Sequence, residues 1–238
     1  GASGIGAAAA RRFHAEGAKV VIADLNDALG EALAAELGAG RALYQHTDVA
    51  DWPAVEALMQ RAVDAYGRLD VLFNNAGIGC FGATPDLDIA EWQRVINIDL
   101  NSVFYGCKAA IPHMRKNGGG AIVNTASASG LAGDYSFTAY NAAKGAVINY
   151  TRAAGIDHAR EGIRINAVCP GPVATPIIAA MNGSAAGAGM TLPMQLDMRI
   201  MAEDAKYGFV FNRRGFVPEL GSTWMLPRLI GTAKAMDV

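Results

Sequence analysis

Hydrophobic and polar positions follow one repeating order up to about residue 175 of this chain. Strands are predicted by short β-branched runs, at residues 19–23, 41–46, 69–73, 121–126 and 163–168. Helices are predicted by the longer stretches between them, at residues 5–16, 26–37, 52–66, 89–116 and 137–160. Strands that alternate with helices are typical of a parallel sheet with helices on both faces. We therefore expect an α/β fold with a doubly wound parallel sheet, and a ligand site at the carboxyl ends of its strands.

The pattern changes after Pro176. Residues 182–191 are small and rich in glycine and alanine, and residues 208–218 are aromatic and basic. Helices are expected at 219–226 and 231–238, with no low-complexity linker and no internal repeat. The sequence thus predicts two parts, residues 1–175 and residues 176–238.

Composition and charge exclude several classes of partner. The formal net charge of the 238 residues is −2, which argues against nucleic acid or an acidic membrane as a partner. The three cysteines are scattered, as in a reducing compartment, and the four histidines show no metal-ligand spacing, so no metal is expected. We see no apolar run of transmembrane length and no signal peptide. A cytoplasmic protein is expected.

Three polar side chains between residues 127 and 144 point to proton transfer. Tyr140 and Lys144 are four positions apart on a predicted helix, so they share one face. A free tyrosine titrates near pH ~10, and an ammonium group one turn away favours the phenolate. The hydroxyl of Ser127 can hold a substrate carbonyl or alcohol oxygen. A tyrosine and a lysine at this spacing are also typical of a solvated helix face, so the rest of the chain decides between the two interpretations.

Small and acidic residues after the predicted strands indicate a nucleotide site. The segment Gly1-Ala2-Ser3-Gly4-Ile5-Gly6 opens a helix, where free N–H groups and the helix dipole favour a pyrophosphate. A carboxylate at Asp24 would accept hydrogen bonds from an adenosine ribose and repel a 2′-phosphate. Asp48 follows the next strand and could hold an adenine amino group. Asn74-Asn75-Ala76-Gly77 follows a further strand with side chains small enough for a cofactor to lie close.

Together with Pro170, Gly171 and Thr175, these motifs resemble the short-chain dehydrogenase/reductase family over residues 1 to about 175. The resemblance implies a Rossmann-like sheet and hydride transfer between NAD(H) and an alcohol or carbonyl carbon. Ser127 would orient the substrate, Tyr140 would be the general acid/base, and Lys144 would lower the tyrosine pKa and bind the nicotinamide ribose. Cofactor contacts are implied for Ser3, Gly4, Ile5, Gly6, Asp24, Leu25, Asp48, Val49, Asn75, Ala76, Gly77, Tyr140, Lys144, Pro170, Gly171, Val173 and Thr175.

The same resemblance implies further partners. Asp24, with no basic residue in the glycine turn, favours NAD over NADP. The substrate would be a small alcohol or carbonyl compound, and homo-oligomers would form through the helices at 89–116 and 137–160. Phe81, Leu131 and Tyr135 are candidates to border the substrate pocket, and they serve equally well as packing residues.

Two departures from the family pattern lie within the first part. The spacing of Gly1 and Gly4 places the family's first glycine, and the whole first strand, upstream of this chain. That strand is central in the fold, so we expect a groove in the sheet with unpaired edges. The helix asparagine of the family's proton relay aligns with Asp99, which we count among the catalytic candidates, because a carboxylate there could hold a water near Lys144.

The last part is similar to another family, the enoyl-CoA hydratase/isomerase (crotonase) family. The resemblance rests on the stretch 176–189, which ends rich in glycine, and continues through 205–209, 213–219 and 226–231. It implies that the N–H of Ala188 faces a thioester oxygen. The two glutamates that hydratases use align with Thr191 and Phe211, so hydration is not expected. Glu219 aligns with the base of some isomerases, and it also suits a carboxylate that stabilises a helix N-terminus.

Three functions therefore stay open. The first is an NAD(H)-dependent oxidoreductase, the second is a crotonase-like acyl-CoA isomerase fragment, and the third is an inactive chimeric or truncated chain. Fusion by recombination, misassembly of a gene sequence, omitted flanking segments and a deliberate chimera would each produce this arrangement. We also expect that residues 176–181, an apolar strand candidate, could pair in the position of the absent first strand.

Overall fold

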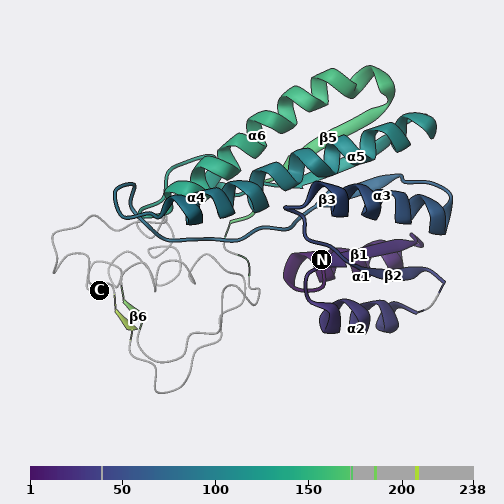
Figure 1. Cartoon of the computed structure of the whole chain (residues 1–238), viewed down its shortest axis with the longest axis horizontal. Coiled ribbons are helices and arrows are strands. Elements are labelled where there is room, and N and C mark those ends of the chain that lie inside the picture. Colours follow the sequence, from purple (N-terminus) through teal and green to yellow (C-terminus); the bar gives the residue numbers. More distant parts are fainter. Residues whose placement is uncertain (39, 172, 174–184, 187–206, 209–238) are drawn as a thin grey trace, which may run out of the picture. The chain divides into compact units, whose positions relative to one another are not determined.

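The computed structural model describes residues 1–38, 40–171, 173, 185–186 and 207–208 (Figure 1). The contacts divide the chain into two units, Gly1–Pro170 and Gly171–Val238. In the second unit the described residues form one short parallel pair, β6 (Ala185–Ala186) with β7 (Tyr207–Gly208). The expected helices at 219–226 and 231–238 and the strand candidate at 176–181 lie outside the described residues.

The first unit contains two parallel sheets. Strand β1 (Val20–Asp24) pairs with β2 (Ala42–His46), with Val20 opposite Ala42 and Asp24 opposite His46. The other sheet has the order β3-β4-β5 and is formed by β3 (Val71–Asn74), β4 (Gly120–Thr125) and β5 (Ile163–Val168). These strands alternate with helices, so the α/β, Rossmann-like fold expected from the sequence is confirmed.

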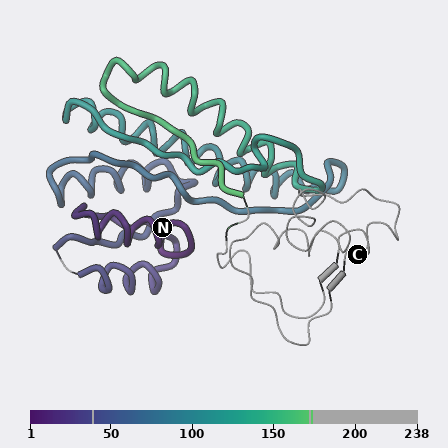
Figure 2. Tube along the Cα trace, turned by 180° about the vertical axis from the view of Figure 1, so that it is seen from behind, coloured from purple at the N-terminus to yellow at the C-terminus, as the bar shows by residue number. Residues whose placement is uncertain are grey.

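Six α-helices accompany these strands in the described part of the first unit. They are α1 (Gly4–Ala15), α2 (Asp27–Leu37), α3 (Trp52–Tyr66), α4 (Ile89–Ile96), α5 (Ser102–Lys116) and α6 (Thr138–His158). Figures 1 and 2 show α5 and α6 side by side next to the β3-β4-β5 sheet, and α2 next to β1 and β2.

Local sequence signals set the ends of these helices. The side chain of Asn26 accepts a hydrogen bond from the Leu29 N–H at the start of α2, and Asp51 does the same for Ala54 at the start of α3. Helix α3 ends at Gly67, whose φ of 80° lies in the left-handed region that glycine adopts without strain. The helix predicted over 89–116 is continuous, but its middle, Asn97–Asn101, is a π-helical turn.

The hydrophobic core lies mainly around the β3-β4-β5 sheet. Ile122 of β4 is fully buried against helix residues that include Val103 and Met114 of α5 and Val147 of α6. A smaller cluster joins α1, β1 and α2 through five buried residues, Ala2, Ala7, Ala10, Ile22 and Leu33. Each sheet therefore has its own packing cluster, and a third, small cluster joins Val95 of α4 to Ala139 and Ala143 of α6.

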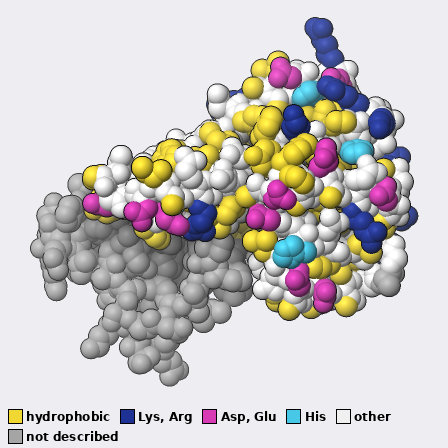
Figure 3. Space-filling model, viewed as in Figure 1, with side chains coloured by type: hydrophobic (Ala, Val, Ile, Leu, Met, Phe, Trp, Pro, Cys, Tyr) yellow, Lys and Arg dark blue, Asp and Glu magenta, His cyan; other side chains and the backbone are white. Residues whose placement is uncertain are grey.

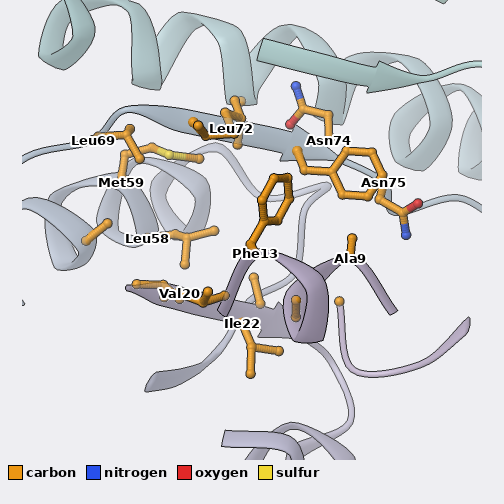
Figure 4. Close-up of a pocket in the computed structure, with 18 of the residues that line it drawn as sticks. Ala9, Phe13, Val20, Ile22, Leu58, Met59, Leu69, Leu72, Asn74 and Asn75 are labelled. Atoms are coloured by element: carbon orange, nitrogen blue, oxygen red, sulfur yellow. The ribbon is translucent and has the colours of Figure 1, made fainter. Parts of the chain in front are cut away.

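A gap separates the two sheets. Among the described residues, β1 pairs only with β2 and β3 pairs only with β4. A cavity of about 520 Å³ is lined by residues of both facing edges (Figure 4). The groove and the unpaired edges that the sequence predicted for an absent central strand are thus present in the structure.

Candidate active site

The polar candidates follow the carboxyl ends of parallel strands. Strand β3 ends at Asn74, just before Asn75-Ala76-Gly77, and β4 ends at Thr125, two residues before Ser127. The strands β3, β4 and β5 are parallel neighbours, so these ends meet at one edge of the sheet. The long helix α6 brings Tyr140 and Lys144 to the same edge.

Lys144 is the best-fixed group in this region. Its side chain is only 3% exposed, and its Nζ donates a hydrogen bond of 2.9 Å to the carbonyl oxygen of Thr125. The same Nζ lies 3.1 Å from Oδ1 of Asp99, whose side chain is fully buried. A buried ammonium needs such a partner, since an unpaired charge in the core costs several kcal/mol. Asp99 therefore holds the position of Lys144.

Asp99 itself is held by the backbone after β3. The Ile78 N–H donates to Oδ2 of Asp99 at 3.0 Å. A Cβ placed on Gly77 would lie 2.6 Å from Oδ1 of Asp99 and 3.2 Å from Nζ of Lys144, so only glycine fits there. Burial raises the pKa of Asp99, and the Lys144 charge and the Ile78 N–H act in the opposite direction. The π-helical turn that carries Asp99 is a type of distortion that is frequent at functional sites.

Tyr140 lies one turn before Lys144, with its ring centroid 5.6 Å from Nζ. Burial raises the pKa of Tyr140, contact with Ser127 lowers it, and the charges of Asp99 and Asp134 raise it. The net direction is upward, so the expected lowering of the tyrosine pKa by Lys144 is not met in this structure. The main physical reason is burial, which disfavours the charged phenolate, and the Asp99 charge acts in the same direction.

Ser127 is placed by a short turn between β4 and α6. Its side chain is buried, and its Oγ accepts a hydrogen bond of 3.2 Å from the Ser129 N–H at the start of the 3-10 turn Ala128–Gly130. The Ser127 hydroxyl is also close enough to the Tyr140 phenol to lower its pKa, so both hydroxyl groups can face one substrate oxygen. Gly130 packs directly on α6, because a Cβ there would lie 2.6 Å from the carbonyl carbon of Lys144. The turn that carries Ser127 is thereby fixed against the helix that carries Lys144.

An aromatic stack continues from Tyr140 toward solvent. The ring of Phe137 lies 4.8 Å from that of Tyr140, and the ring of Phe81 lies 4.7 Å from that of Phe137. Phe81 is 81% exposed, Leu131 is 66% exposed and Tyr135 is 90% exposed. Sequence reasoning named these three but missed Phe137. The available signal was the three-residue spacing from Phe137 to Tyr140 at the start of a helix.

The glycine turn and the segment after β3 lie together. A Cβ on Gly6 would be 2.9 Å from the Cα of Gly1 and 3.1 Å from Nδ2 of Asn75. Ser3 precedes α1 without a capping side-chain hydrogen bond, and the first turn carries no acidic residue. The first-turn N–H groups therefore suit an anion. Asn75 also accepts a hydrogen bond from the Thr125 hydroxyl at 3.3 Å.

Asp24, at the carboxyl end of β1, binds the backbone of this turn. Its Oδ2 accepts from the Gly1 amino group at 2.7 Å and from the Ala2 N–H at 2.8 Å, and its Oδ1 accepts from the Asn26 N–H at 3.0 Å. Partial burial works the other way, but these bonds lower the pKa of Asp24 to about 2. The carboxylate is therefore ionised and still has free lone pairs for a ribose.

Other implied contacts are placed less directly. Asp48 is exposed and its Oδ1 accepts from the Ala50 N–H at 2.9 Å, while Leu25 is 58% exposed. Val49 is half-buried and borders the cavity between the sheets. The carbonyl oxygen of Pro170 accepts from the Ala128 N–H at 2.9 Å, next to Ser127.

Several other candidates fall outside this site as it is described. Gly171 and Val173 belong to the second unit. Thr175, Ala188, Thr191, Phe211 and Glu219 lie outside the described residues.

The site residues fit a dinucleotide cofactor. The glycine turn leaves no room for larger side chains beside Asn75, and Gly77 brings the backbone against the Asp99–Lys144 pair. Such close backbone approaches are what a flat, phosphate-bearing ligand requires along the carboxyl ends of a sheet. The uncapped start of α1 offers N–H donors for the phosphates.

Comparison with known proteins agrees with this architecture. The model of the short chain dehydrogenase family matches residues 1–185, and that of the enoyl-CoA hydratase/isomerase family matches residues 171–238. The chain is 49% identical over 173 residues to meso-2,3-butanediol dehydrogenase of Serratia marcescens, covering 73% of this chain and 68% of that protein. It is 47% identical over 186 residues to cis-4-hydroxycyclohexanecarboxylate dehydrogenase of Sinomonas cyclohexanicum, covering 76% of this chain and 73% of that protein. It is 41% identical over 180 residues to cyclohexanol dehydrogenase of an Acinetobacter strain, covering 74% of this chain and 72% of that protein.

The fold and these matches define the class of protein as an α/β oxidoreductase, of a family whose dehydrogenases typically use NAD or NADP. The chain belongs to the short-chain dehydrogenase family, and its last 68 residues, 171–238, are similar to the enoyl-CoA hydratase/isomerase family. Both resemblances seen in the sequence are thus confirmed. None of the helices in the described part of the chain is both long and apolar enough to cross a bilayer.

Proposed function

We propose that this chain interconverts an alcohol and a carbonyl compound by hydride transfer, with Tyr140 as the acid/base. The observation that carries the proposal is the fixed cluster of Lys144, Asp99 and the Thr125 carbonyl one helical turn from Tyr140. A buried, paired lysine beside a half-buried phenol is costly to maintain in a core, and it suits a site that moves a proton.

The residues of the chain handle the proton and the substrate oxygen. In the oxidative direction, the Tyr140 phenolate accepts the proton of the substrate hydroxyl, and the Ser127 hydroxyl donates a hydrogen bond to the same oxygen. In the reductive direction, the phenol returns that proton to the oxygen of the carbonyl. A bound nicotinamide supplies the hydride acceptor or donor.

Asp99 sets the direction in which this site works best. Its charge opposes ionisation of Tyr140, so the phenol keeps its proton at neutral pH. A protonated Tyr140 is the form required for carbonyl reduction, and the phenolate is the form required for alcohol oxidation. We therefore infer that reduction is favoured near neutral pH and that oxidation rises at alkaline pH.

NAD(H) is the proposed cofactor. Asp24 is ionised at the carboxyl end of β1, where a carboxylate accepts from ribose hydroxyls and repels a 2′-phosphate. Cofactor contacts are proposed for the residues named from the sequence, with Gly77 and Lys144 nearest the reacting end and Asp24 nearest the adenosine. Thr175, Gly171 and Val173 stay in this proposal as the segment after β5.

The proposed substrate is a small apolar alcohol or ketone. The rings of Phe81 and Phe137 extend from Tyr140 and give the site an apolar wall. The names of the relatives, which include a butanediol dehydrogenase and a cyclohexanol dehydrogenase, agree with this chemistry.

Organisation of the chain is proposed on the same basis. We place the oxidoreductase domain at 1–175 and the crotonase-like segment at 176–238, in the cytoplasm.

Homo-oligomers would form through α5 and α6. Hydrophobic side chains gather on part of the face seen in Figure 3. Phe104 of α5 is 45% exposed, and Ile156 of α6 is 78% exposed. Exposed aromatic and aliphatic groups on neighbouring helices suit such an interface.

A direct test combines cofactor binding with turnover. NADH fluorescence titration should give saturable binding, and oxidation of butane-2,3-diol or cyclohexanol should be detectable with NAD. Tyr140→Phe should keep NADH binding and lose about 10²–10⁴-fold in turnover, the range of general acid–base catalysis. Tyr66→Phe is the matched control, because Tyr66 lies at the end of α3 and is not among the site candidates. Absence of NADH binding by the folded chain, or full activity of Tyr140→Phe, would reject the proposal.

A second candidate function follows from the match of residues 171–238 to the enoyl-CoA hydratase/isomerase family. It assigns the chain an acyl-CoA isomerase activity, with Ala188 and Glu219 as its site. This function predicts that the chain binds an enoyl-CoA thioester and that NADH does not affect this binding. Glu219→Gln should weaken the binding or abolish turnover of the thioester. Turnover of such a thioester without NAD dependence would favour it over the oxidoreductase.

A further inference from the structure

The buried pair beside Tyr140 carries no net charge. Nζ of Lys144 lies 3.1 Å from Oδ1 of Asp99, and the two side chains are 3% and 0% exposed. In the described part of the chain, the groups that hydrogen-bond to the Asp99 carboxylate are Lys144 and the Ile78 N–H, and both are donors. A protonated carboxyl would require an acceptor for its own O–H, so both members of the pair are ionised.

The charges around the pair leave this balance unchanged. Arg94 of α4 acts on the pKa of Asp99, but its guanidinium pairs with Glu91, with Nη2 2.9 Å from Oε2, and both side chains are about half exposed. Asp134 acts on Tyr140 from the loop before α6, where it is half-buried. Charges in contact with water are screened, whereas a buried pair is screened much less. Lys144 and Asp99 therefore dominate the electrostatics beside Tyr140.

In the proposed reaction, the nicotinamide ring lies near this pair. The substrate oxygen is within hydrogen-bond reach of Tyr140, and the hydride passes between two carbons about 3–3.5 Å apart. The ring centroid of Tyr140 is 5.6 Å from Nζ of Lys144. The nicotinamide is thus on the order of 10 Å from either charge.

The two forms of the cofactor differ in one charge, which lies on this ring. The nicotinamide is cationic in NAD⁺ and neutral in NADH, while the phosphates, the riboses and the adenine are the same. Contacts with these shared groups cancel in the ratio of the two dissociation constants. An unpaired Lys144 would weaken NAD⁺ relative to NADH by about tenfold, the effect of one unit charge at ~10 Å with an effective dielectric constant of ~20.

We propose that Asp99 determines which redox form of the nicotinamide cofactor the site prefers. By neutralising Lys144, its carboxylate removes the charge that would repel the cationic ring, so NAD⁺ binds about tenfold better relative to NADH than it would beside an unpaired lysine. The inference rests on the proposed use of NAD(H). It assigns Asp99 an effect on cofactor binding that is separate from its effect on the ionisation of Tyr140.

The preference for NAD⁺ also favours carbonyl reduction on the protein. In reduction the hydride leaves NADH for the carbonyl carbon, and Tyr140 gives its proton to the carbonyl oxygen, so NAD⁺ and an alcohol are formed. Stronger binding of NAD⁺ shifts the equilibrium between the bound forms toward these products. A tenfold change in the ratio corresponds to about 30 mV in the midpoint potential of the bound two-electron couple.

The test compares the dissociation constants of NAD⁺ and NADH without substrate. NADH binding is followed by fluorescence titration, and NAD⁺ binding by displacement of NADH. In Asp99→Asn the amide oxygen still accepts from Lys144 but leaves its charge unpaired, so the ratio of the NAD⁺ constant to the NADH constant should rise about tenfold.

Asp64→Asn is the matched control, because it removes the same charge at a distant place. Asp64 is exposed in the last turn of α3, and the chain runs from the end of α3 into the start of β3. It therefore lies toward the opposite edge of the sheet from the carboxyl ends of the strands. Its replacement should leave the ratio unchanged.

A double variant keeps the proposal testable if Asp99→Asn does not fold. Asp99→Asn/Lys144→Met contains neither charge, so no member of the pair is left buried without its partner. It should bind both forms more weakly, because Lys144 is a proposed cofactor contact, but its ratio should stay within about threefold of that of the wild-type chain. If the Lys144 charge acted on the ring in full in the wild-type chain, removal of both groups would instead lower the ratio by about tenfold.

Each result counts for or against the proposal. A rise of the ratio in Asp99→Asn that the double variant reverses would support it. An unchanged ratio in Asp99→Asn, an equal rise in Asp64→Asn, or a large fall in the double variant would overturn it while the proposed cofactor stands. Binding of neither NAD⁺ nor NADH by a chain that melts cooperatively would reject the proposed cofactor and this inference together.

Discussion

The Asp99 carboxylate lies 3.1 Å from the Lys144 ammonium, and neither side chain is exposed by more than 3%. A pair this deeply buried is held together because separating the charges in the core would be costly. The pair also decides how much of the lysine charge reaches Tyr140. A lysine without such an anion would lower the phenol pKa, whereas here burial and, to a smaller extent, the Asp99 charge raise the pKa of Tyr140.

Replacing Asp99 by Asn should shift the pH dependence of alcohol oxidation. The Asp99 charge raises the pKa of Tyr140, so its removal should lower that pKa and move the alkaline rise of kcat/KM to lower pH. An amide oxygen can still accept from Lys144 and from the Ile78 N–H. The measurement is kcat/KM against pH for Asp99→Asn, with Asp86→Asn as a control in an exposed loop. An unchanged profile, or a shift to higher pH, would contradict the prediction.

Asp24 should make stability depend on pH in the acid range. Its pKa is lowered to about 2 in the folded chain, below the value of 3.8 for a free aspartate. The stabilisation is therefore present above the unfolded pKa and is lost as the pH falls from about 4 through about 2. It amounts to at most roughly 2 kcal/mol. Urea unfolding between pH 5 and pH 2 should show this loss in the wild-type chain, and a smaller loss in Asp24→Asn. Equal losses in both chains would argue against it.

Asp24 should also set the choice between the two nicotinamide dinucleotides. Removing its charge in Asp24→Ser takes away the repulsion toward a 2′-phosphate and one acceptor for the ribose, so NADPH should gain relative to NADH. The ratio of the two dissociation constants should change by about tenfold or more, which is ~1.4 kcal/mol. Asp27→Ser is the control, because Asp27 is an exposed acid nearby that pairs with His46. If both variants change the ratio equally, Asp24 has no special role.

Gly130 and Gly133 form a matched pair within one loop. A Cβ on Gly130 would lie 2.6 Å from the carbonyl carbon of Lys144, whereas on Gly133 the nearest atom lies 4.0 Å away. Gly130→Ala should therefore destabilise the chain by about 1–3 kcal/mol and reduce turnover by moving Ser127 relative to α6. Gly133→Ala should change neither. Thermal melts and turnover of both variants check this, and similar melting of the two would show that the loop yields without cost.

Much of the fold could be predicted from local patterns. The β-branched run at 163–168 coincides with β5, and the helix at 52–66 coincides with α3, since Asp51 and Gly67 mark its ends. The gap in the sheet was also predictable, because the spacing of Gly1 and Gly4 placed the first strand of the family pattern before residue 1. Alternation and caps are local signals, and the fold follows them closely.

The finer features of the site depended on contacts between distant residues. Alignment picked out Asp99, but its charge acts on Tyr140 only because a π-helical turn carries it to Lys144. The Thr125 carbonyl that binds Lys144 is a backbone group, so no residue type signals it. Phe137 escaped notice because an aromatic residue before a helix is common, and only the ring of Phe81 gives it a place in the site.

The separate packing clusters of the two sheets have a consequence for cooperativity. The cluster of α1, β1 and α2 contains only five buried apolar residues, while that around β4 is several times larger. Regions with fewer buried contacts open at lower free energy, as independent foldons. Residues 1–48, which include the glycine turn and Asp24, would thus open more often than the half with Tyr140 and Lys144. Part of the binding free energy of an adenosine group would therefore be used to close that first foldon, so the measured affinity would be lower than the affinity of the closed form.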